Sequence, residues 1–385
     1  MSIRQHNLGS IVKPGFNALG PQTSTTTYFP YLYSWGSNAK GQLGLNNLTT
    51  YSSPKQVGTL TTWAIISVAN EMSAAIKNDG TLWTWGTNTY GQLGLNTAGA
   101  SYYKSSPTQV GALTNWKIVD AGSNTVLATK IDGTLWAWGR NNQGQLGLGT
   151  SGAYTEKSSP VQVGALTNWA TVCQAGLFSA SIKTDGTLWT WGFGPMGQLG
   201  LNNLTSYSSP KQVGVLTNWK QITAASNALL SVKTDGTLWS WGAPYSGQTG
   251  LGVNAVYYSS PKQVGALTTW KQVDGGLNGA KAIKIDNTLW VWGDGTSGAL
   301  GLGNLTSYSS PKQLGSLTNW STVSYGNWFS LATKTDGTLW SWGDNALGKL
   351  GLGNTTYYSS PKQVGALTTW LTVSCGTNSS LALLY

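Results

Sequence analysis

The chain has 385 residues and a formal net charge of +10, although only 9% of its residues are charged. It contains no run of about 18 apolar residues, which excludes a membrane-spanning helix. Much of its polarity comes from Ser, Thr, Asn and Gln, a composition that is unusual for a cytosolic enzyme and common in rigid β-rich extracellular or virion proteins. The N-terminus lacks an apolar segment of the signal-peptide kind, so we expect no secretory leader.

Residues 1–30 precede any repeated pattern. A Lys-Pro-Gly-Phe stretch and a Gly-Pro pair block regular secondary structure there, and the apolar content is too small to form a core. A disordered tail is one interpretation. The other is an extended arm that docks on another virion or scaffold protein, because chain ends are ordered when they are tied down. We predict such an arm, anchored by Ile11, Lys13, Pro14 and Phe16.

From residue 31 onward the sequence repeats with a period of about 51 residues, which indicates stacked supersecondary units. Most copies contain an Asp-Gly or similar turn, a Leu-Trp-x-Trp-Gly run, a Gly-Gln-Leu-Gly-Leu-Gly-like run and a Ser-Ser-Pro-Lys-Gln-Val-Gly-like run. The copy that begins at Tyr31 lacks the turn and has Tyr33 in place of the first tryptophan. The tryptophan before the glycine occurs seven times, at Trp35, Trp85, Trp138, Trp191, Trp241, Trp292 and Trp342.

Each repeat is predicted to form four β-strands. Runs such as Leu339–Trp342 are rich in aromatic residues and alternate in character, which favours strands, and Asp336-Gly337 between two such runs predicts a hairpin. No segment has a sustained 3.6-residue apolar period. The sequence therefore predicts an all-β, seven-bladed β-propeller over residues 31–385, with four-stranded antiparallel blades.

The two ends of the repeat region predict how the ring closes. Residues 31–36 match the third strand of the repeat, and residues 380–385 match the second. The last blade should therefore combine N- and C-terminal strands, which removes the open edges of the array.

The motif Asp-Gly-x-Leu-Trp-x-Trp-Gly-x-Asn-x-x-Gly-Gln-Leu-Gly-Leu-Gly resembles the repeat of the regulator of chromosome condensation family. The resemblance runs from about residue 31 to residue 385. It implies a seven-bladed propeller and leaves the function open, because propellers of this family serve unrelated partners.

The strand order assigns the loops to two faces. The Asp-Gly turns and the Gly-x-Leu-Thr crossovers between blades lie on one face, which we call the uniform face. The first and third connections of each blade lie on the other, the variable face, whose loops differ in sequence. Large apolar residues in variable loops are typical of interfaces. We predict a partner-binding surface there, with the alternative that each residue plugs the channel mouth: Met72, Tyr90, Phe178, Phe193, Met196, Tyr245 and Trp328.

The sequence offers little for catalysis. His6 is the only histidine, and six aspartates occupy hairpin turns. Asp120 and Asp274 share a repeat position three blades apart, so they should not form a carboxylate pair. No helix follows the glycine-rich runs to receive a phosphate. We therefore predict that the protein is not an enzyme and binds no metal and no cofactor.

The basic residues are spread around the ring. Six lysines each stand two residues before a turn, and five lie in Pro-Lys-Gln runs. We interpret them as a solvated ring that keeps the protein soluble, with no dedicated nucleic-acid binding. Cys173 and Cys375 lie in blades that are not neighbours, so no disulfide is expected between them.

Three functions remain. We favour a bacteriophage virion component, located in the virion and anchored by the arm, whose variable face meets a host surface protein or glycan. The arm resembles attachment segments of phage-encoded propellers of this repeat class. The alternative is a secreted bacterial propeller that binds or inhibits another protein and is extracellular. The third is a guanine-nucleotide exchange factor for a small GTPase, as in the family's namesake.

Overall fold

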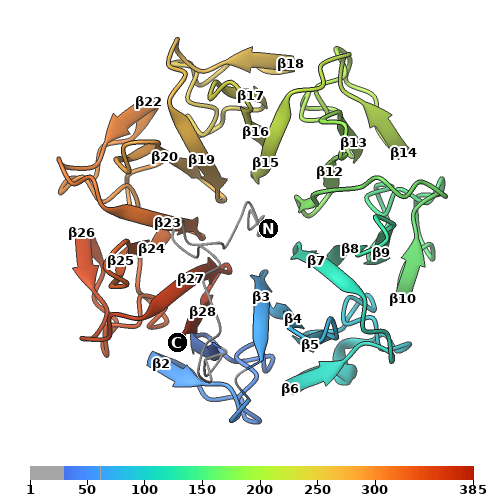
Figure 1. Cartoon of the computed structure of the whole chain (residues 1–385), viewed down its shortest axis with the longest axis horizontal. Coiled ribbons are helices and arrows are strands. Elements are labelled where there is room, and N and C mark those ends of the chain that lie inside the picture. The colour runs from blue at the N-terminus through green and yellow to red at the C-terminus, as the bar shows by residue number, and fades with distance from the viewer. Residues whose placement is uncertain (1–29, 61) are drawn as a thin grey trace, which may run out of the picture.

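The computed structural model describes residues 30–60 and 62–385. The predicted arm residues Ile11, Lys13, Pro14 and Phe16 lie outside the described residues, so their role stays a prediction. Seven four-stranded antiparallel sheets surround a central axis, which confirms the predicted propeller (Figure 1). In the described part of the chain, no helix is long and apolar enough to cross a membrane.

We number the blades along the chain from β3, so blade 1 is β3–β6 and blade 6 is β23–β26. The innermost strands are β3 (Trp63–Val68), β7 (Trp116–Ala121), β11 (Cys173–Gln174), β15 (Trp219–Ala225), β19 (Trp270–Gly275), β23 (Trp320–Tyr325) and β27 (Trp370–Cys375). The second strands are β4 (Met72–Lys77), β8 (Thr125–Lys130), β12 (Phe178–Ile182), β16 (Ala228–Lys233), β20 (Gly279–Lys284), β24 (Phe329–Lys334) and β28 (Ser379–Leu384).

The third strands are β1 (Tyr31–Gly36), β5 (Leu82–Gly86), β9 (Leu135–Gly139), β13 (Leu188–Gly192), β17 (Leu238–Gly242), β21 (Leu289–Gly293) and β25 (Leu339–Gly343). The outer strands are β2 (Tyr51–Gln56), β6 (Lys104–Gln109), β10 (Lys157–Gln162), β14 (Tyr207–Gln212), β18 (Tyr258–Gln263), β22 (Tyr308–Gln313) and β26 (Tyr358–Gln363). One 3-10 turn, η1 (Ala100–Tyr102), precedes β6.

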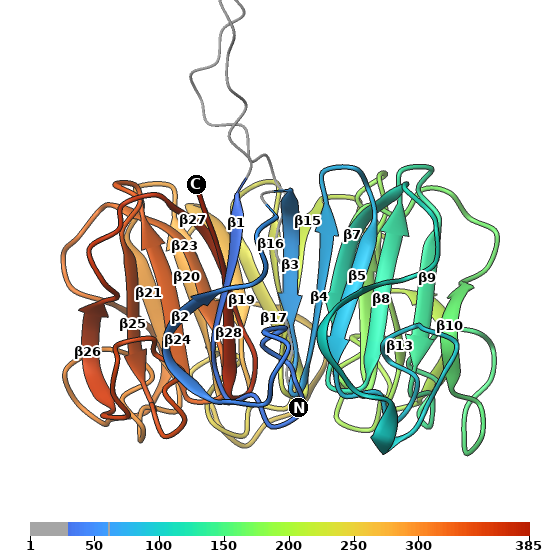
Figure 2. The ribbon, with the colours of Figure 1, turned by 90° about the horizontal axis from the view of Figure 1, so that it is seen from below.

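Blade 7 has the strand order β2-β1-β28-β27, so it joins the two ends of the repeat region as predicted. Tyr31 pairs with Leu384 and Gly36 with Ser379 in antiparallel register. Figure 2 shows the C-terminus at the same edge of the disc as the start of β1. The ring is thus closed by main-chain hydrogen bonds between residues more than 340 positions apart, and blade 7 has the same strand arrangement as the others.

The second tryptophan of each Leu-Trp-x-Trp-Gly run joins neighbouring blades. Trp85 is fully buried, and its Nε1 donates to the Gln42 carbonyl of the preceding blade at 2.9 Å. All seven blades repeat this bond. A Cβ on Gly44 would lie 2.8 Å from that same indole nitrogen, so the glycine of the Gln-Leu-Gly run is required for the approach.

Six lysines contradict the prediction of a solvated ring. Lys77 is only 7% exposed, and its Nζ lies 4.9 Å from the Trp63 ring centroid and 3.8 Å from that of Trp83. Burial lowers the pKa of its ammonium group, which cation–π contacts with the two rings stabilise. Lys130, Lys183, Lys233, Lys284 and Lys334 repeat the arrangement. The lysines of the Pro-Lys-Gln runs are exposed, as expected.

A ring of side chains joins the innermost strands. One repeat position holds Ser67, Asp120, Cys173, Thr223, Asp274, Ser324 and Ser374. At six of the seven blade junctions, an oxygen of this side chain accepts a hydrogen bond from a main-chain N–H of the next blade, over 2.7–3.3 Å. Cys173, between blades 3 and 4, makes no such bond to Ala224. The carboxylates of Asp120 and Asp274 therefore link blades, each in its own part of the ring.

Candidate functional site: the variable face

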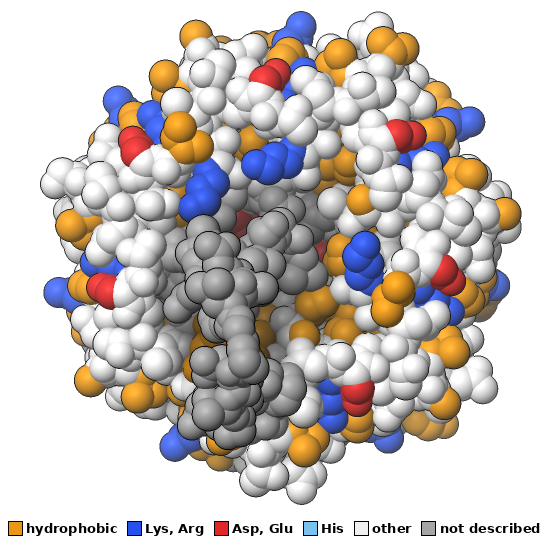
Figure 3. Space-filling view, in the orientation of Figure 1, with side chains coloured by type: hydrophobic (Ala, Val, Ile, Leu, Met, Phe, Trp, Pro, Cys, Tyr) orange, Lys and Arg blue, Asp and Glu red, His pale blue; other side chains and the backbone are white. Residues whose placement is uncertain are grey.

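The uniform face is nearly the same in blades 1–6, whereas in blade 7 the paired chain segments at Tyr31 and Leu384 stand in place of the turn. In blade 1, Asp79 accepts hydrogen bonds from the N–H and hydroxyl of Thr81 at 2.9 and 2.6 Å, and the Gly80 carbonyl accepts from Trp116 N at 3.1 Å. The turn and the crossover are therefore neighbours, as predicted. Figure 3 views this face, where acidic side chains recur around the disc beside basic and hydrophobic ones. Among blades 1–6 this regularity leaves few differences that a partner could recognise.

The variable face is built by paired loops. In each blade, the residue after the third strand donates its N–H to a carbonyl in the first connection, as Arg140 does to Asn124 at 2.8 Å. The two loops of a blade are thus held together at the rim. Their side chains differ between blades, and three groups of them stand out.

The first group spans blades 3 and 4. The Tyr245 hydroxyl lies 3.2 Å from Met196 Sδ, and the Tyr245 and Tyr257 rings meet edge to face at 5.7 Å. Tyr245 is 50% exposed and Tyr257 is 46% exposed. We call Met196, Tyr245 and Tyr257 the tyrosine patch. Such half-exposed aromatic side chains, already held in place by their neighbours, lose little entropy when a partner covers them.

The second group lies at the junction of blades 1 and 2. The guanidinium of Arg140 stands 4.9 Å from the centroid of the Tyr90 ring. Both residues are partly buried. This cation–π pair fixes a positive charge over an aromatic ring at the rim.

The third group belongs to blades 5 and 6. Trp328 has φ of 57°, the left-handed region that bulky residues rarely adopt. Its Nε1 donates to Asp294 Oδ2 at 3.4 Å, so the indole extends from the β23–β24 connection onto blade 5. One blade further on, Lys349 forms an ion pair with Asp344 at 2.7 Å. Burial lowers the pKa of the Lys349 ammonium group, and Asp344 counteracts this shift.

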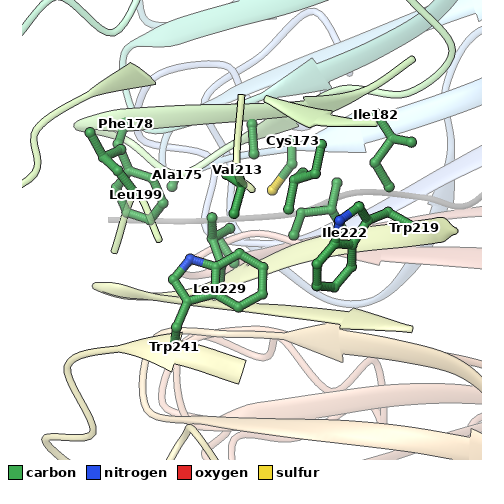
Figure 4. Packing of buried hydrophobic residues seen from close by; sticks show 13 residues of the cluster. Cys173, Ala175, Phe178, Ile182, Leu199, Val213, Trp219, Ile222, Leu229 and Trp241 are labelled. Carbon is green, nitrogen blue, oxygen red and sulfur yellow. The ribbon is translucent and has the colours of Figure 1, made fainter. Parts of the chain in front are cut away.

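Two of the predicted partner-binding residues are corrected by the structure. Met72 and Phe178 are 0% exposed and belong to hydrophobic clusters between blades. Figure 4 shows Phe178 in the packing around Cys173 and Leu199. Each is the first residue of a second strand rather than a loop residue, so its side chain turns into the blade junction. Tyr90, Phe193, Met196 and Trp328 remain partly accessible, and Tyr245 is exposed.

Sequence reasoning also missed functional candidates. Tyr257 was not predicted, although it ends the Val-Asn-Ala-Val-Tyr run in which blade 4 departs from the usual Asn-Leu-Thr-Ser. Lys281 was missed as well: it is fully buried, and its Nζ lies 3.5 Å from the Tyr325 ring centroid and donates to the Ala299 carbonyl at 2.9 Å. Its counterparts in the other blades are Ala or Leu, so an alignment of the repeats shows Lys281 as a charged residue at an otherwise apolar position.

The described residues contain no group of three His, Cys, Asp or Glu side chains that could hold a metal ion. Both cysteines are free and buried, in agreement with the expected absence of a disulfide between them. Burial raises the pKa of the Cys173 thiol, which makes a thiolate at this position unfavourable.

The repeat and its closure define a class of protein, the seven-bladed propellers with blades of about 51 residues joined by buried tryptophans. A family model described as the RCC1-like domain matches residues 31–382, and the chain belongs to this family. The resemblance drawn from the repeat motif is confirmed. A bacteriophage origin has no support among the relatives described below and stays a prediction.

Several curated proteins are similar over part of the chain. Probable E3 ubiquitin-protein ligase HERC6 of Homo sapiens is 32% identical over 176 residues, which is 44% of this chain and 17% of the relative. Ultraviolet-B receptor UVR8 of Arabidopsis thaliana is 29% identical over 177 residues, which is 45% of this chain and 39% of the relative. The matches thus span well under half of either relative.

Solved structures extend the similarity over nearly the whole chain. Human WBSCR16 has a TM-score of 0.82 at 20% identity, covering 92% of this chain and 98% of that one. Prp20p of Saccharomyces cerevisiae has a TM-score of 0.80 at 20% identity, covering 93% and 92%. At this identity the likeness shows the fold alone.

These relatives overturn the prediction that the protein is not an enzyme. HERC6 and HERC2 are named as E3 ubiquitin-protein ligases, and the matching segments make up only 17% and 4% of their lengths. The prediction rested on the absence of catalytic motifs from the repeats. Because the repeats are a small part of each of those ligases, motifs absent from the repeats do not decide the activity of a whole protein.

Proposed function

We propose that this propeller is a protein-binding module whose variable face docks a protein partner, with the tyrosine patch as the main anchor. The observation that carries the proposal is the exposure of Tyr245 and Tyr257, at 50% and 46%, in a pre-arranged contact with Met196. Aromatic side chains held in this way dominate the binding energy of many protein interfaces, at about 2 kcal/mol or more for a central residue.

The absence of charged residues from the loops around the patch favours an apolar contact. The loops that carry it, residues 193–197, 243–247 and 253–257, contain no charged residue. A partner that buries the patch therefore loses no hydration of a charged group there, which is the condition under which aromatic anchors contribute most. The Tyr90–Arg140 pair and the Trp328–Asp294 pair lie on other blades of the same face, where they would supply polar contacts around the anchor.

Family members support a role in protein binding and leave the partner open. Prp20p has been described with its binding properties to Gsp1p and histones, whereas UVR8 and the HERC proteins are named for other activities. Binding of a glycan by the variable face stays an alternative. The virion role and virion location also stay predictions, because the arm on which they depend lies outside the described residues.

The guanine-nucleotide exchange alternative has one observation in its favour, the fold similarity to Prp20p over more than nine tenths of both chains. It predicts that the protein accelerates release of a fluorescent guanine nucleotide from a small GTPase. No acceleration across a panel of GTPases, with the partner-binding experiment below still positive, would leave the protein-binding role without exchange activity.

A photo-crosslinking experiment tests the proposal. p-Benzoylphenylalanine is placed at Tyr245 in the full chain, and the matched control carries it at Leu216, which is 44% exposed in the crossover from blade 3 to blade 4, on the uniform face. We expect a defined protein adduct from position 245 in the native source, and its loss when Tyr257→Ser is added. Equal adducts from both positions would contradict a variable-face interface. Glycan-array binding without any protein adduct would favour a carbohydrate target.

A further inference from the structure

The seven blades act as internal references for one another, and blades 5 and 6 differ from the rest at one position. Five blades have a glutamine in the Gly-Gln-Leu-Gly run, whose Oε1 accepts from a main-chain N–H of the third connection, as in Gln42 with Lys40 N at 2.9 Å. Blade 5 has Ala299 and blade 6 has Lys349 at this position. The usual loop-closing acceptor is therefore missing from both.

An aspartate takes over the loop closure in both blades. Asp294 Oδ1 accepts from Thr296 N at 2.8 Å, and Asp344 Oδ1 accepts from Ala346 N at 3.1 Å. Each aspartate directly follows the third strand, where the other blades have Ser, Thr, Arg, Phe or Ala. In each carboxylate, Oδ1 closes the turn. The partner of the second oxygen, Oδ2, differs between the two blades.

In blade 6 a cation compensates the aspartate. Lys349 Nζ lies 2.7 Å from Asp344 Oδ2 and also donates to the Asn327 carbonyl at 3.1 Å. The lysine side chain is only 2% exposed, so this ion pair is completed inside the protein. The negative charge of the Asp344 carboxylate is therefore already compensated by Lys349 and is a poor binding site for a partner's cation.

In blade 5 the corresponding donor is neutral. The indole N–H of Trp328 occupies the equivalent role, with Asp294 Oδ2 at 3.4 Å. The Asn278 side-chain amide is oriented so that its nitrogen donates to the Leu277 carbonyl at 3.3 Å. Its oxygen then accepts from the same Trp328 N–H at 2.5 Å. In the part of the chain that the structure describes, no lysine or arginine pairs with Asp294. The Asp294 carboxylate thus has no cationic partner among the described residues, and it lies beside a large aromatic ring.

The backbone at Trp328 shows that this arrangement is held against a local cost. None of the six counterparts of Trp328 has positive φ, and the left-handed region is unfavourable for a bulky residue. Trp328 has this strained backbone conformation, and its indole extends onto blade 5. Both Trp328 and Asp294 keep part of their surface exposed on the variable face.

We propose that Trp328 and Asp294 form a site for a cationic side chain, an arginine or lysine of a partner protein. The ligand's charge would lie beside the exposed part of the Asp294 carboxylate, while its apolar stem or guanidinium plane packs on the indole. The identity of the cation as part of a protein rests on the proposed function. The site itself does not, and it is tested without any partner.

The test uses fluorine NMR of the full chain labelled with 5-fluorotryptophan. Trp328→Asn, which installs the residue found at four counterpart positions, identifies the Trp328 resonance by its loss. The labelled protein is titrated with acetyl-Gly-Arg-Gly-amide and with the citrulline peptide, which has nearly the same shape and no charge. We expect the Trp328 signal to shift with the arginine peptide and at least tenfold more weakly with the citrulline peptide.

Matched variants separate this site from general charge effects. Asp294→Asn should weaken arginine binding about tenfold, a loss typical of one charge-assisted contact. Asp344→Asn, which removes a carboxylate already paired with Lys349, should change it less than twofold. Ala299→Lys should abolish it, because the new ammonium would complete the pair within blade 5.

Equal shifts with arginine and citrulline, or unchanged binding by Asp294→Asn, would overturn the proposal. The Asp294→Asn variant preserves volume and its loop-closing acceptor, so a negative result cannot be assigned to misfolding if its circular dichroism and unfolding midpoint match the parent. Failure here with an intact crosslink at Tyr245 leaves the protein-binding function standing. Binding of the arginine peptide without a crosslink at Tyr245 would establish the cation site, and it would show that the cation does not come from a partner bound at the tyrosine patch.

Discussion

Two neighbouring junctions between blades are built on different principles. Between blades 4 and 5, Gln221 exchanges two hydrogen bonds with the main chain of Val273, at 2.7 and 2.9 Å, and Thr223 Oγ1 accepts from Gly275 N at 3.2 Å. Between blades 3 and 4, Cys173 stands where Thr223 would be, and it belongs to a hydrophobic cluster of 13 buried residues (Figure 4).

This difference shows that one repeat position can be filled in two ways without altering the fold. A polar side chain at the inner rim satisfies a main-chain N–H and fixes the angle between blades, whereas the apolar junction depends on packing area. The tyrosine patch lies on the variable face of the apolar junction, and Trp328 lies at the junction of blades 5 and 6, where the polar ring contains Asp274. The following predictions test how much each kind of junction contributes.

The largest expected effect follows from removing a buried carboxylate. Asp274 accepts from Tyr325 N at 2.7 Å, and it pairs in register with the fully buried Lys281. Asp274→Ala leaves that N–H without its acceptor and deprives the buried ammonium of a nearby negative charge. We expect a loss of about 3–5 kcal/mol in the free energy of unfolding.

Chemical denaturation at neutral pH measures this loss. Asp235→Ala, at an exposed turn position in the neighbouring blade, is the control and should cost much less. A loss below about 1 kcal/mol for Asp274→Ala would show that the inner ring contributes little to stability.

The second effect is a pH dependence caused by Lys281. Burial lowers the pKa of its ammonium group from 10.5 to about 7 in the folded protein. Between pH 7 and 10.5 the unfolded chain binds more protons at this residue, so stability should rise with pH, and below pH 7 the full penalty applies. The shift corresponds to about 5 kcal/mol over the whole window, as an upper bound.

Lys281→Leu removes this contribution and installs the residue found at the counterpart positions Leu331 and Leu381. The measurement is the difference between the unfolding free energies of variant and parent from pH 6 to pH 9. Leu should be the more stable side chain at pH 6, with its advantage shrinking as pH rises. A difference that does not change with pH would mean that Lys281 stays charged when buried.

The third prediction removes the second polar element of the junction between blades 4 and 5. Gln221→Ala loses both bonds to Val273, so we expect a loss of about 2 kcal/mol. Thr171→Ala is the corresponding change at the apolar junction, because Thr171 is the counterpart of Gln221. We expect it to cost less than half as much in the same denaturation assay. Equal losses would remove the distinction between the two junctions.

The architecture of the ring was predictable because the repeated sequence motif determines it. Seven copies of one motif, with the chain entering at a third strand and leaving after a second, specify the blade number and the composite blade. The burial of lysines such as Lys77 was not predictable from spacing. It depends on two tryptophans from different strands meeting over one ammonium group, and strand register decides that.

The variable face was predictable as a face and less so residue by residue. Met72 and Phe178 appear as loop residues in the sequence, and a shift of one position places them in the core. The cation site was readable in principle, since Ala299 and Lys349 both interrupt the Gly-Gln-Leu-Gly run. What the sequence could not show is that Trp328 reaches back to the preceding blade, because that follows from its left-handed backbone.

The smallest expected effect comes from converting the apolar junction into a polar one. Cys173→Ser places a hydroxyl where Ser67 and Thr223 already accept from the next blade, at 2.9 and 3.2 Å. The new hydrogen bond to Ala224 N should be largely offset by burying a hydroxyl among apolar side chains, so we expect stability to change by less than about 1 kcal/mol. Hydrogen exchange is the sharper measurement, because the Ala224 amide should exchange more slowly relative to its neighbours even when the global stability is unchanged. Unaltered exchange at Ala224 together with a loss of stability would mean that the hydroxyl does not reach the next blade, and that packing alone determines the geometry of this junction.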